Sequence, residues 1–245
     1  MEPIITLKSV SKAFKTSGQP LHVLADIDLE IYSGEFFMFL GPSGSGKSTT
    51  LRVMSGLEKD YKGKVMLGEG ITRKDISFVF QEFALLPWLT VAENVELGLL
   101  ARNINISERQ RIVRKELELL GLDKFGHVYP RDLSGGMKQR VGIARAFATD
   151  PKIIFMDEPF SELDSFTAEE LRKKLLSIWQ ERKVTIVMVS HIVEEALELA
   201  DRIAVLTPRP SKIERLIANS LPRPRHKRTE EFFRMEDELY RIIKP

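Results

Sequence analysis

The sequence predicts an α/β protein with a mostly parallel sheet and flanking helices. One observation behind this prediction is a set of short apolar runs that end at polar or glycine-rich residues. Continuous hydrophobicity over so few residues is typical of strands buried on both faces. The other observation is that stretches with helical spacing alternate with these runs. The predicted strands are residues 36–40, 76–80, 153–156 and 184–189.

Helices are predicted where apolar residues recur on one face. Residues 107–120 have this spacing, and Ser107 and Gln110 are placed as a capping box that would start the helix there. Residues 167–182 have the same spacing. Residues 83–135 are mainly helical, which predicts a lobe that extends to about residue 150.

The two ends of the chain differ in character. A smaller antiparallel sheet is expected from residues 4–7, 23–24 and 27–31. Residues 202–206 predict one more strand, and a basic stretch punctuated by prolines then leads to a helical segment from Thr229. We interpret this stretch as a solvated edge, with a lipid or regulatory contact as the alternative. The expected organisation is one domain over residues 1–230 and a helical tail over residues 231–245.

The composition excludes several classes of protein. The 245 residues include 37 Lys and Arg against 35 Asp and Glu, and a net charge of +2 is too balanced for neutralising a nucleic-acid backbone. The absence of cysteine excludes a disulfide framework, a zinc ribbon and a thiol nucleophile. The sequence shows neither a membrane span of ~20 apolar residues nor a signal peptide, so we expect an intracellular chain that does not itself cross a bilayer.

A glycine-rich stretch follows the predicted strand at residues 36–40 and opens a helical stretch, which is the context that a phosphate-binding loop requires. Glycines let successive N–H groups turn inward, and the helix N-terminus adds partial positive charge. We therefore predict that a nucleoside triphosphate and Mg²⁺ bind here, with Lys47 reaching the β- and γ-phosphates and Ser48 coordinating Mg²⁺; the nucleotide is ATP if the family resemblance described below holds. The predicted loop is Gly41, Pro42, Ser43, Gly44, Ser45, Gly46, Lys47, Ser48 and Thr49.

Two adjacent acids, Asp157 and Glu158, end the predicted strand at residues 153–156. Neighbouring side chains on a strand point to opposite faces, so the two carboxylates can have separate tasks. Asp157 would hold Mg²⁺, and Glu158 would orient or deprotonate the attacking water. The alternative is that the two acids only begin a turn before Pro159.

Residues 133–140 read Leu-Ser-Gly-Gly-Met-Lys-Gln-Arg and precede an amphipathic helix, so Ser134, Gly135 and Gly136 form a second helix start that can bind an anion. Alone this is an ordinary N-cap. Together with the phosphate loop it resembles the signature of the ABC ATPases, and the resemblance covers residues 4–228. The chain is also similar to ATP-binding subunits of importers for nitrate, sulfonates and taurine. That narrower similarity rests on residues 80–88, on the signature with Met137, and on residues 208–210 and 221–225.

The resemblance implies a phosphate-loop NTPase core of the ABC type with an antiparallel β subdomain and an α-helical lobe. It also assigns roles that spacing alone does not. Gln81 matches the glutamine that contacts Mg²⁺ and the attacking water, and His191 matches the switch histidine at the γ-phosphate. Asp164 lies in the loop that crosses to the partner subunit. Phe14 matches the aromatic residue that stacks on adenine, with a place in the core as the alternative.

The resemblance further implies a homodimer packed head to tail, with ATP between one subunit's Lys47 loop and the other's Ser134 to Gly136. Motion would pass near Gln81 and Trp88 to transmembrane permease subunits, and a solute-binding protein would act indirectly. The protein would then lie on the cytoplasmic face of the membrane. The alternative for Trp88 is a place in the core. Glu162 and Ile192 depart from the family pattern, where a small residue and an aspartate are usual.

Two other classes of protein compete with a transport ATPase. A GTPase or small-molecule kinase has no support, because the guanine-reading motif Asn-Lys-x-Asp is absent and neither class accounts for the signature. A soluble ABC ATPase acting on nucleic acid or ribosomes is the other. The chain has one cassette, and the gap between Gln81 and Ser134 is too short for long coiled coils. We expect no nucleic-acid partner, and the solute stays open.

Overall fold

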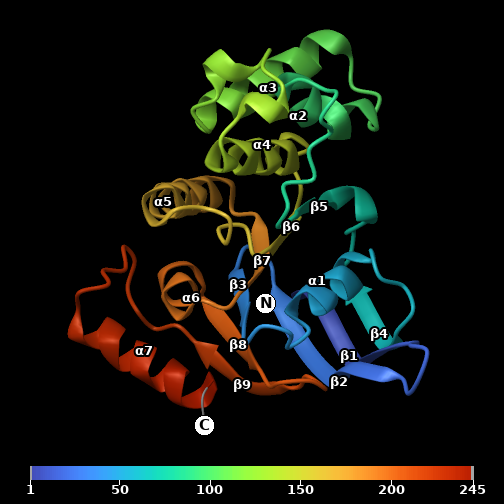
Figure 1. Cartoon of the computed structure of the whole chain (residues 1–245), viewed down its shortest axis with the longest axis vertical. Coiled ribbons are helices and arrows are strands. Elements are labelled where there is room, and N and C mark those ends of the chain that lie inside the picture. Colours follow the sequence, from blue (N-terminus) through green and yellow to red (C-terminus); the bar gives the residue numbers. More distant parts are fainter. Residues whose placement is uncertain (1, 244–245) are drawn as a thin grey trace. The chain divides into compact units, whose positions relative to one another are not determined.

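The computed structural model describes residues 2–243 and divides into two compact units (Figure 1). Unit 1 consists of Met1–Arg73 and Lys183–Pro245, and unit 2 consists of Lys74–Arg182. Among the residues described, none of the helices has the length and the apolar character that a membrane crossing requires.

Unit 1 contains an antiparallel sheet with the strand order β2-β1-β4. Its strands are β1 (Pro3–Phe14), β2 (Leu21–Tyr32) and β4 (Lys62–Leu67). In β2, buried Ile27, Leu29 and Ile31 alternate with exposed polar residues, as in a sheet with one face on the core. The predicted antiparallel sheet is confirmed, and its strands extend beyond the short apolar runs that predicted them.

Unit 1 also contains parallel strands in the order β7-β3-β8. All residues of β3 and β7 are buried, which agrees with the continuous hydrophobicity of their sequences. An edge strand, β9, pairs antiparallel with β8 and was not predicted. The bounds are β3 (Phe36–Leu40), β7 (Thr185–Ser190), β8 (Arg202–Leu206) and β9 (Ile213–Ala218). Helix α1 (Lys47–Ser55) follows β3, and α6 (Val193–Leu199) follows β7.

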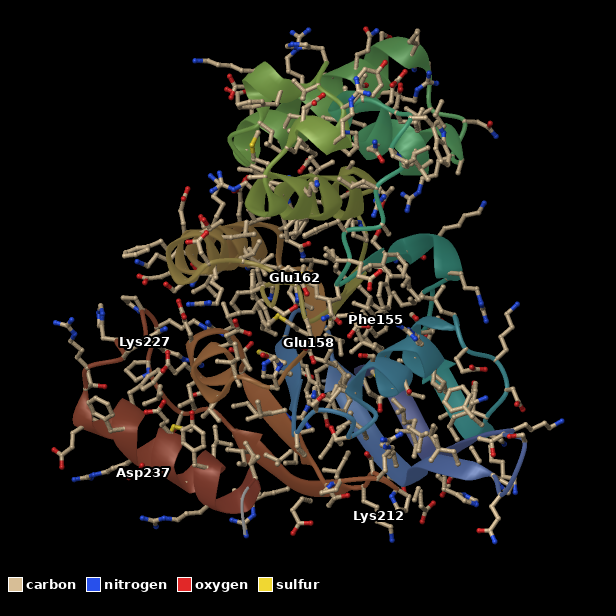
Figure 2. The ribbon with its side chains drawn as sticks, viewed as in Figure 1. Phe155, Glu158, Glu162, Lys212, Lys227 and Asp237 are labelled. Atoms are coloured by element: carbon tan, nitrogen blue, oxygen red, sulfur yellow. The ribbon has the colours of Figure 1, made fainter. Side chains whose placement is uncertain are left out.

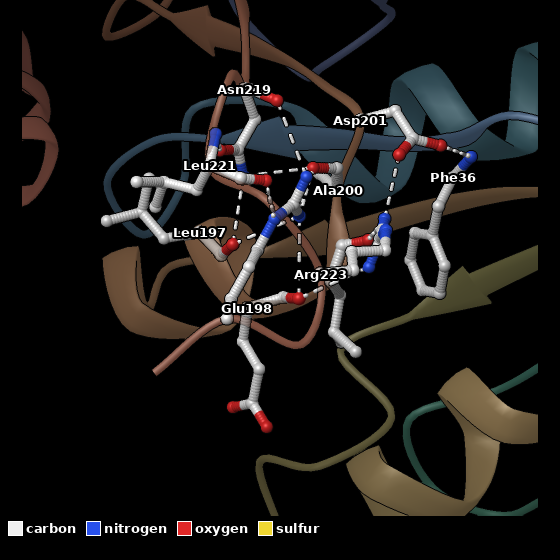
Figure 3. Close-up of polar contacts among 10 residues, drawn as sticks. Phe36, Leu197, Glu198, Ala200, Asp201, Asn219, Leu221 and Arg223 are labelled. Carbon is white, nitrogen blue, oxygen red and sulfur yellow. Dashed lines mark hydrogen bonds and ion pairs between the residues drawn. The ribbon is translucent and has the colours of Figure 1, made fainter. Parts of the chain in front are cut away.

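The basic stretch after β9 is bound to the C-terminal end of α6 (Figure 3). Arg225 donates to the Ala200 carbonyl at 2.6 Å, and Arg223 donates to the Leu199 carbonyl at 2.6 Å and to the Asp201 carboxylate at 2.8 Å. The last carbonyls of a helix lack intrahelical partners and carry partial negative charge. The guanidinium groups supply both the missing hydrogen-bond donors and a compensating positive charge. Our interpretation of this stretch as a solvated edge was therefore wrong for Arg223 and Arg225, which we call the arginine clamp.

The last helix, α7 (Glu230–Ile243), packs against α6 and β8. Phe232 and Leu239 are buried on its inner face, while Phe233 on the outer face is 53% exposed. Lys227, just before α7, pairs with Glu194 of α6 at 3.0 Å. The helical segment expected from Thr229 is thus present, and it is attached to unit 1 by both apolar and charged contacts.

Unit 2 contains the parallel pair β5 (Ile76–Val79) and β6 (Ile153–Asp157) together with its helices. Helices α2, α3 and α4 pack on one another and form the helical part that the sequence predicted. The bounds are α2 (Val91–Leu100), α3 (Ile106–Leu119), α4 (Gly135–Ala148) and α5 (Ser165–Arg182). Short 3₁₀ turns span Asp123–Phe125 and Pro130–Asp132.

The start of α3 differs from the prediction. The cap is Asn105, whose side-chain oxygen accepts the N–H of Glu108 at 3.0 Å. Ser107 lies inside the first turn, and its hydroxyl donates to the Asn105 side chain at 2.8 Å. The capping box predicted from Ser107 and Gln110 was wrong, because Asn is as good an N-cap as Ser and stands two residues earlier.

Candidate nucleotide-binding site

The glycine-rich loop of unit 1 connects β3 to α1 and adopts a conformation that needs its glycines. Gly44 has φ 77° and Gly46, the N-cap of α1, has φ 84°. Both values lie in the left-handed region, which is costly for residues with a Cβ. A Cβ on Gly46 would also lie 2.9 Å from Cγ1 of Val23. The loop therefore bends sharply at Gly44 and Gly46 and places the N-terminus of α1 at its end.

The side chain of Lys47 reaches back to the first residues of the glycine-rich loop. Its side chain is almost fully buried, and Nζ donates to the carbonyls of Gly41 at 2.9 Å and Pro42 at 3.0 Å. The ammonium therefore lies beside the start of the loop, close to where the N-terminus of α1 begins. Thr50 completes the first turn, since both its N–H and its hydroxyl bond to the Gly46 carbonyl. A cation and a helix N-terminus together favour a multiply charged anion.

His191 follows β7 at the same edge of the parallel strands as the phosphate loop. In the β3–β7 register Leu40 lies opposite Ser190, so both chains leave the sheet side by side. The Ser190 hydroxyl donates to the Glu195 carboxylate at 2.6 Å and accepts the N–H of Ile192 at 3.1 Å. These bonds hold the backbone on both sides of His191, whose exposed side chain follows the carboxyl end of β7.

Phe14 is the last residue of β1, and its ring is 38% exposed. The alternative that it belongs to the core is therefore wrong. The Lys12 ammonium lies 4.5 Å from the ring centroid, and Lys12 is itself buried and paired with Glu58 at 3.3 Å. A cation on a ring face is a favourable contact. We infer that it helps to hold the ring in place.

In unit 2, Gln81 and the two acids lie at one edge of the β5–β6 pair. Val79 lies opposite Met156 in this parallel register, so Asp157 ends β6 at the same edge where Gln81 follows β5. Asp157 is buried, with 2% of its surface exposed. Carboxylate and amide oxygens are donors that Mg²⁺ prefers, and the Ser48 hydroxyl in unit 1 is, taken by itself, a donor of the same kind. The donor set thus fits the ion.

Glu158 is not part of the strand. β6 ends at Asp157, and Glu158 has φ 42°, in the left-handed region. We expected Glu158 to point away from Asp157 because neighbouring residues alternate along a strand. That reason is wrong, because the strand has ended and the backbone turns at Glu158. Its carbonyl accepts the N–H of Ser161 at 3.3 Å and the Ser161 hydroxyl at 3.0 Å. Such a backbone costs about 1–3 kcal/mol and is concentrated at functional sites.

The signature segment caps α4 as predicted. Ser134 is the N-cap, and its hydroxyl accepts the N–H of Met137 at 3.3 Å. A Cβ on Gly136 would lie 2.5 Å from Cγ2 of Thr167 on α5, so a side chain there would force Thr167 to move. Ser134 is exposed, and the N-terminal end of α4 is open at this residue.

The remaining predicted residues lie on the surface of unit 2. The Asp164 carboxylate accepts the N–H groups of Phe166 at 3.1 Å and Thr167 at 3.0 Å, so it caps α5. Hydrogen bonds from the Thr167 side chain and backbone lower the pKa of Asp164. Trp88 is 69% exposed, so the alternative that it belongs to the core is wrong. Glu162 is also exposed, near Glu158 in the segment after β6 (Figure 2).

Comparison with known proteins decides the family. The model of the family described as ABC transporter matches residues 24–161. An aliphatic sulfonates import ATP-binding protein of Bacillus cereus is 41% identical over 93% of this chain and 91% of its own length. A nitrate import ATP-binding protein of Synechocystis is 39% identical over 98% of this chain and 95% of its own length.

The chain belongs to the ABC transporter family. A dimeric ATP-binding cassette solved in a post-hydrolysis state with ADP and phosphate superposes with a TM-score of 0.79 at 36% identity, covering 88% of this chain and 98% of that one. The ABC fold predicted from the sequence is confirmed, and with it an ATPase that binds ATP. Residues that no motif singled out also shape the ABC phosphate loop. Ser211, for example, is fully buried and donates to the Ser45 carbonyl.

Proposed function

We propose that this ABC protein is the ATP-hydrolysing subunit of an importer for a small oxyanion or sulfonate. The single observation that carries the proposal is that one chain holds both a lysine-bearing phosphate loop and an exposed serine-capped helix start, Ser134, in a different unit. Relatives of this chain that import nitrate and aliphatic sulfonates support the class of solute. Which solute is carried depends on separate subunits.

The proposed chemistry divides between the two units. Lys47 and the N–H groups of the loop bind the β- and γ-phosphates, and His191 contacts the γ-phosphate. Asp157, Ser48 and Gln81 would hold Mg²⁺, which neutralises developing phosphate charge. Glu158 accepts the proton of the attacking water, or orients it, and Phe14 stacks on adenine.

Two copies are proposed to close head to tail over ATP. The exposed N-terminus of α4, capped by Ser134, offers N–H groups and partial positive charge to the partner's nucleotide. Asp164 is proposed to lie at the subunit contact. After hydrolysis, the negative charge is divided between two anions, ADP and phosphate. Their mutual repulsion favours opening of the pair. Similarity to a dimeric cassette supports this arrangement.

The partners are proposed to be transmembrane permease subunits, with this chain on the cytoplasmic face of the membrane and a solute-binding protein acting indirectly. Trp88 supports a docking role, because a large aromatic side chain that is 69% exposed is typical of interfaces. Purification of the tagged chain from membranes tests this. A polytopic membrane protein should copurify, and recovery with ribosomes or nucleic acid instead would contradict it.

The Glu158→Gln variant tests the catalytic assignment. The amide keeps the shape but cannot accept the proton, so ATP turnover should fall by roughly 10²–10⁴-fold while ATP binding persists. ATP-bound dimers should accumulate and are measured by light scattering after size-exclusion chromatography. Glu118→Gln on α3 is the matched control, since Glu118 is exposed and should leave turnover unchanged. Normal turnover in Glu158→Gln would refute the assignment.

A further inference from the structure

The loop between β8 and β9, residues 207–212, lies against the phosphate loop within unit 1. At its start, the carbonyl oxygen of Leu206 would lie 3.0 Å from a Cβ on Gly41. At its tip, Nη2 of Arg209 would lie 3.4 Å from a Cβ on Gly44, and Cζ would lie 3.9 Å away. A guanidinium is therefore in van der Waals reach of the phosphate loop at its left-handed glycine.

The loop that carries Arg209 is firmly anchored. Ser211 bonds to β2 through its backbone, with its N–H donating to Val23 at 2.8 Å and its carbonyl accepting from Ala25 at 2.9 Å. Its hydroxyl donates to the Ser45 carbonyl of the phosphate loop. Prolines at positions 208 and 210 fix φ on both sides of Arg209. The position of Arg209 is thus set by the same contacts that shape the phosphate loop.

Arg209 pairs with no acidic side chain in the part of the chain that the structure describes. Within residues 2–243 its exposed guanidinium makes no hydrogen bond and no ion pair. The neighbouring strand shows the opposite case, because Arg202 of β8 pairs with Glu35 at 3.2 Å. A guanidinium presents a planar set of donors that matches phosphate oxygens. A free guanidinium held against a phosphate-binding loop is therefore placed to pair with a negatively charged ligand.

We propose that Arg209 is a further triphosphate-binding residue, which adds a second side-chain cation to the site beside Lys47. This inference rests on the proposed placement of the nucleotide phosphates in residues 41–49. Arg209 raises affinity for the charged phosphate chain by Coulomb attraction and direct hydrogen bonds. Its contribution therefore falls as salt screens the charges.

Equilibrium titration of purified protein with a fluorescent, non-hydrolysable ATP analogue tests the inference. Arg209→Ala should weaken binding by about 5- to 30-fold at low salt, and the gap to the wild type should narrow at high salt. Arg209→Lys should recover part of the loss. Lys212→Ala is the matched control, because Lys212 is an exposed cation in the same loop and its loss changes the net charge equally (Figure 2).

The outcomes separate the inference from the proposed function. If the wild type binds the analogue and Arg209→Ala binds it as well as Lys212→Ala does, Arg209 is not a phosphate-binding residue. A change confined to dimer formation, with unaltered affinity of the single chain, would also overturn the inference. If the wild type fails to bind the analogue, or if Lys47→Ala binds it equally well, the proposed phosphate site itself is wrong.

Discussion

The guanidinium of Arg223 and the carboxylate of Asp201 form an ion pair at 2.8 Å, and the second oxygen of Asp201 accepts the N–H of Phe36 at 2.9 Å (Figure 3). Phe36 begins β3, the strand that leads into the phosphate loop. The C-terminal segment is thus connected through one carboxylate to the strand that carries the loop. The arginine clamp also closes the end of α6, the helix that follows His191.

Removal of the clamp should destabilise the protein. Burial and the nearby Arg223 lower the pKa of Arg225 to about 10, so the side chain is still charged at neutral pH while it donates to helix carbonyls. Arg225→Ala should lower the free energy of unfolding by about 2–4 kcal/mol, because it leaves those acceptors unpaired. Urea unfolding followed by circular dichroism measures this. Arg228→Ala, at an exposed site, should change it by less than about 0.5 kcal/mol, and equal effects would contradict the clamp.

Ser134→Arg should separate ATP binding from hydrolysis. The cap of α4 is lost and a bulky cation replaces a small hydroxyl at an exposed helix start. The single chain should still bind ATP, because the phosphate loop is untouched, while hydrolysis should fall by at least about 10²-fold. ATP affinity and phosphate release measure the two effects. Wild-type turnover in this variant would rule out a site shared between two copies.

Phe14 variants test adenine stacking. Phe14→Leu removes the π face but keeps apolar bulk, so ATP affinity should fall by about 5- to 10-fold. Phe14→Tyr keeps the face and should bind ATP within about twofold of the wild type. Both variants should keep the affinity for inorganic triphosphate, which has no base to stack. Equal binding of ATP by Phe14→Leu and the wild type would remove Phe14 from the site.

Asp164 should stabilise α5 in a pH-dependent way. Hydrogen bonds from Thr167 lower its pKa in the folded state, so its contribution is complete above the unfolded pKa of about 3.9 and is lost as pH falls through the lower folded value. Asp164→Ala should therefore lower Tm at pH 7, and the difference from the wild type should shrink below about pH 4. Thermal scans across this range measure it. A difference that grows in acid would have the wrong sign for a capping carboxylate.

Substitution of Gln139 on α4 should not lower the free energy of unfolding, unlike substitution of most buried residues. Its side chain is fully buried, and neither amide atom has a hydrogen-bond partner among the described residues. Such an arrangement costs about 1–3 kcal/mol for unpaired polar groups. Gln139→Leu should therefore leave the free energy of unfolding unchanged or raise it, whereas Val141→Ala at a neighbouring apolar site should lower it. Denaturant unfolding compares the two, and a strong loss in Gln139→Leu would reveal a partner for the amide.

The sequence predicted most clearly the strands that are buried on both faces, because such strands have a recognisable pattern. Residues 36–40 and 202–206 coincide with β3 and β8, because short apolar runs with polar or glycine-rich flanks have the length of a buried strand and not of a helix. β9 has mostly exposed residues and no clear alternation, so only its pairing with β8 defines it. The arginine clamp was missed for another reason: carbonyl acceptors belong to every residue and leave no mark in a sequence.

The candidate site was predictable to the extent that it is local. The conformation of the glycine-rich loop and the cap at Ser134 depend on neighbouring residues, so local motifs could predict them, while their roles in binding stay predictions. The left-handed backbone of Glu158 was not predictable, since glutamate rarely adopts it. Arg209 approaches Gly44 only through the pairing of distant strands, so no spacing in the chain could have placed it there.

The close approach of Gly136 to Thr167 makes these two positions interdependent over evolutionary time. With 2.5 Å between Cγ2 and the point that a Cβ would occupy, there is room for a methyl group on one side of the α4–α5 contact but not on both. An alanine at 136 would require the Thr167 methyl group to move, or Thr167 to be replaced by a residue such as serine that lacks it. Substitutions at these two positions are therefore expected to depend on each other.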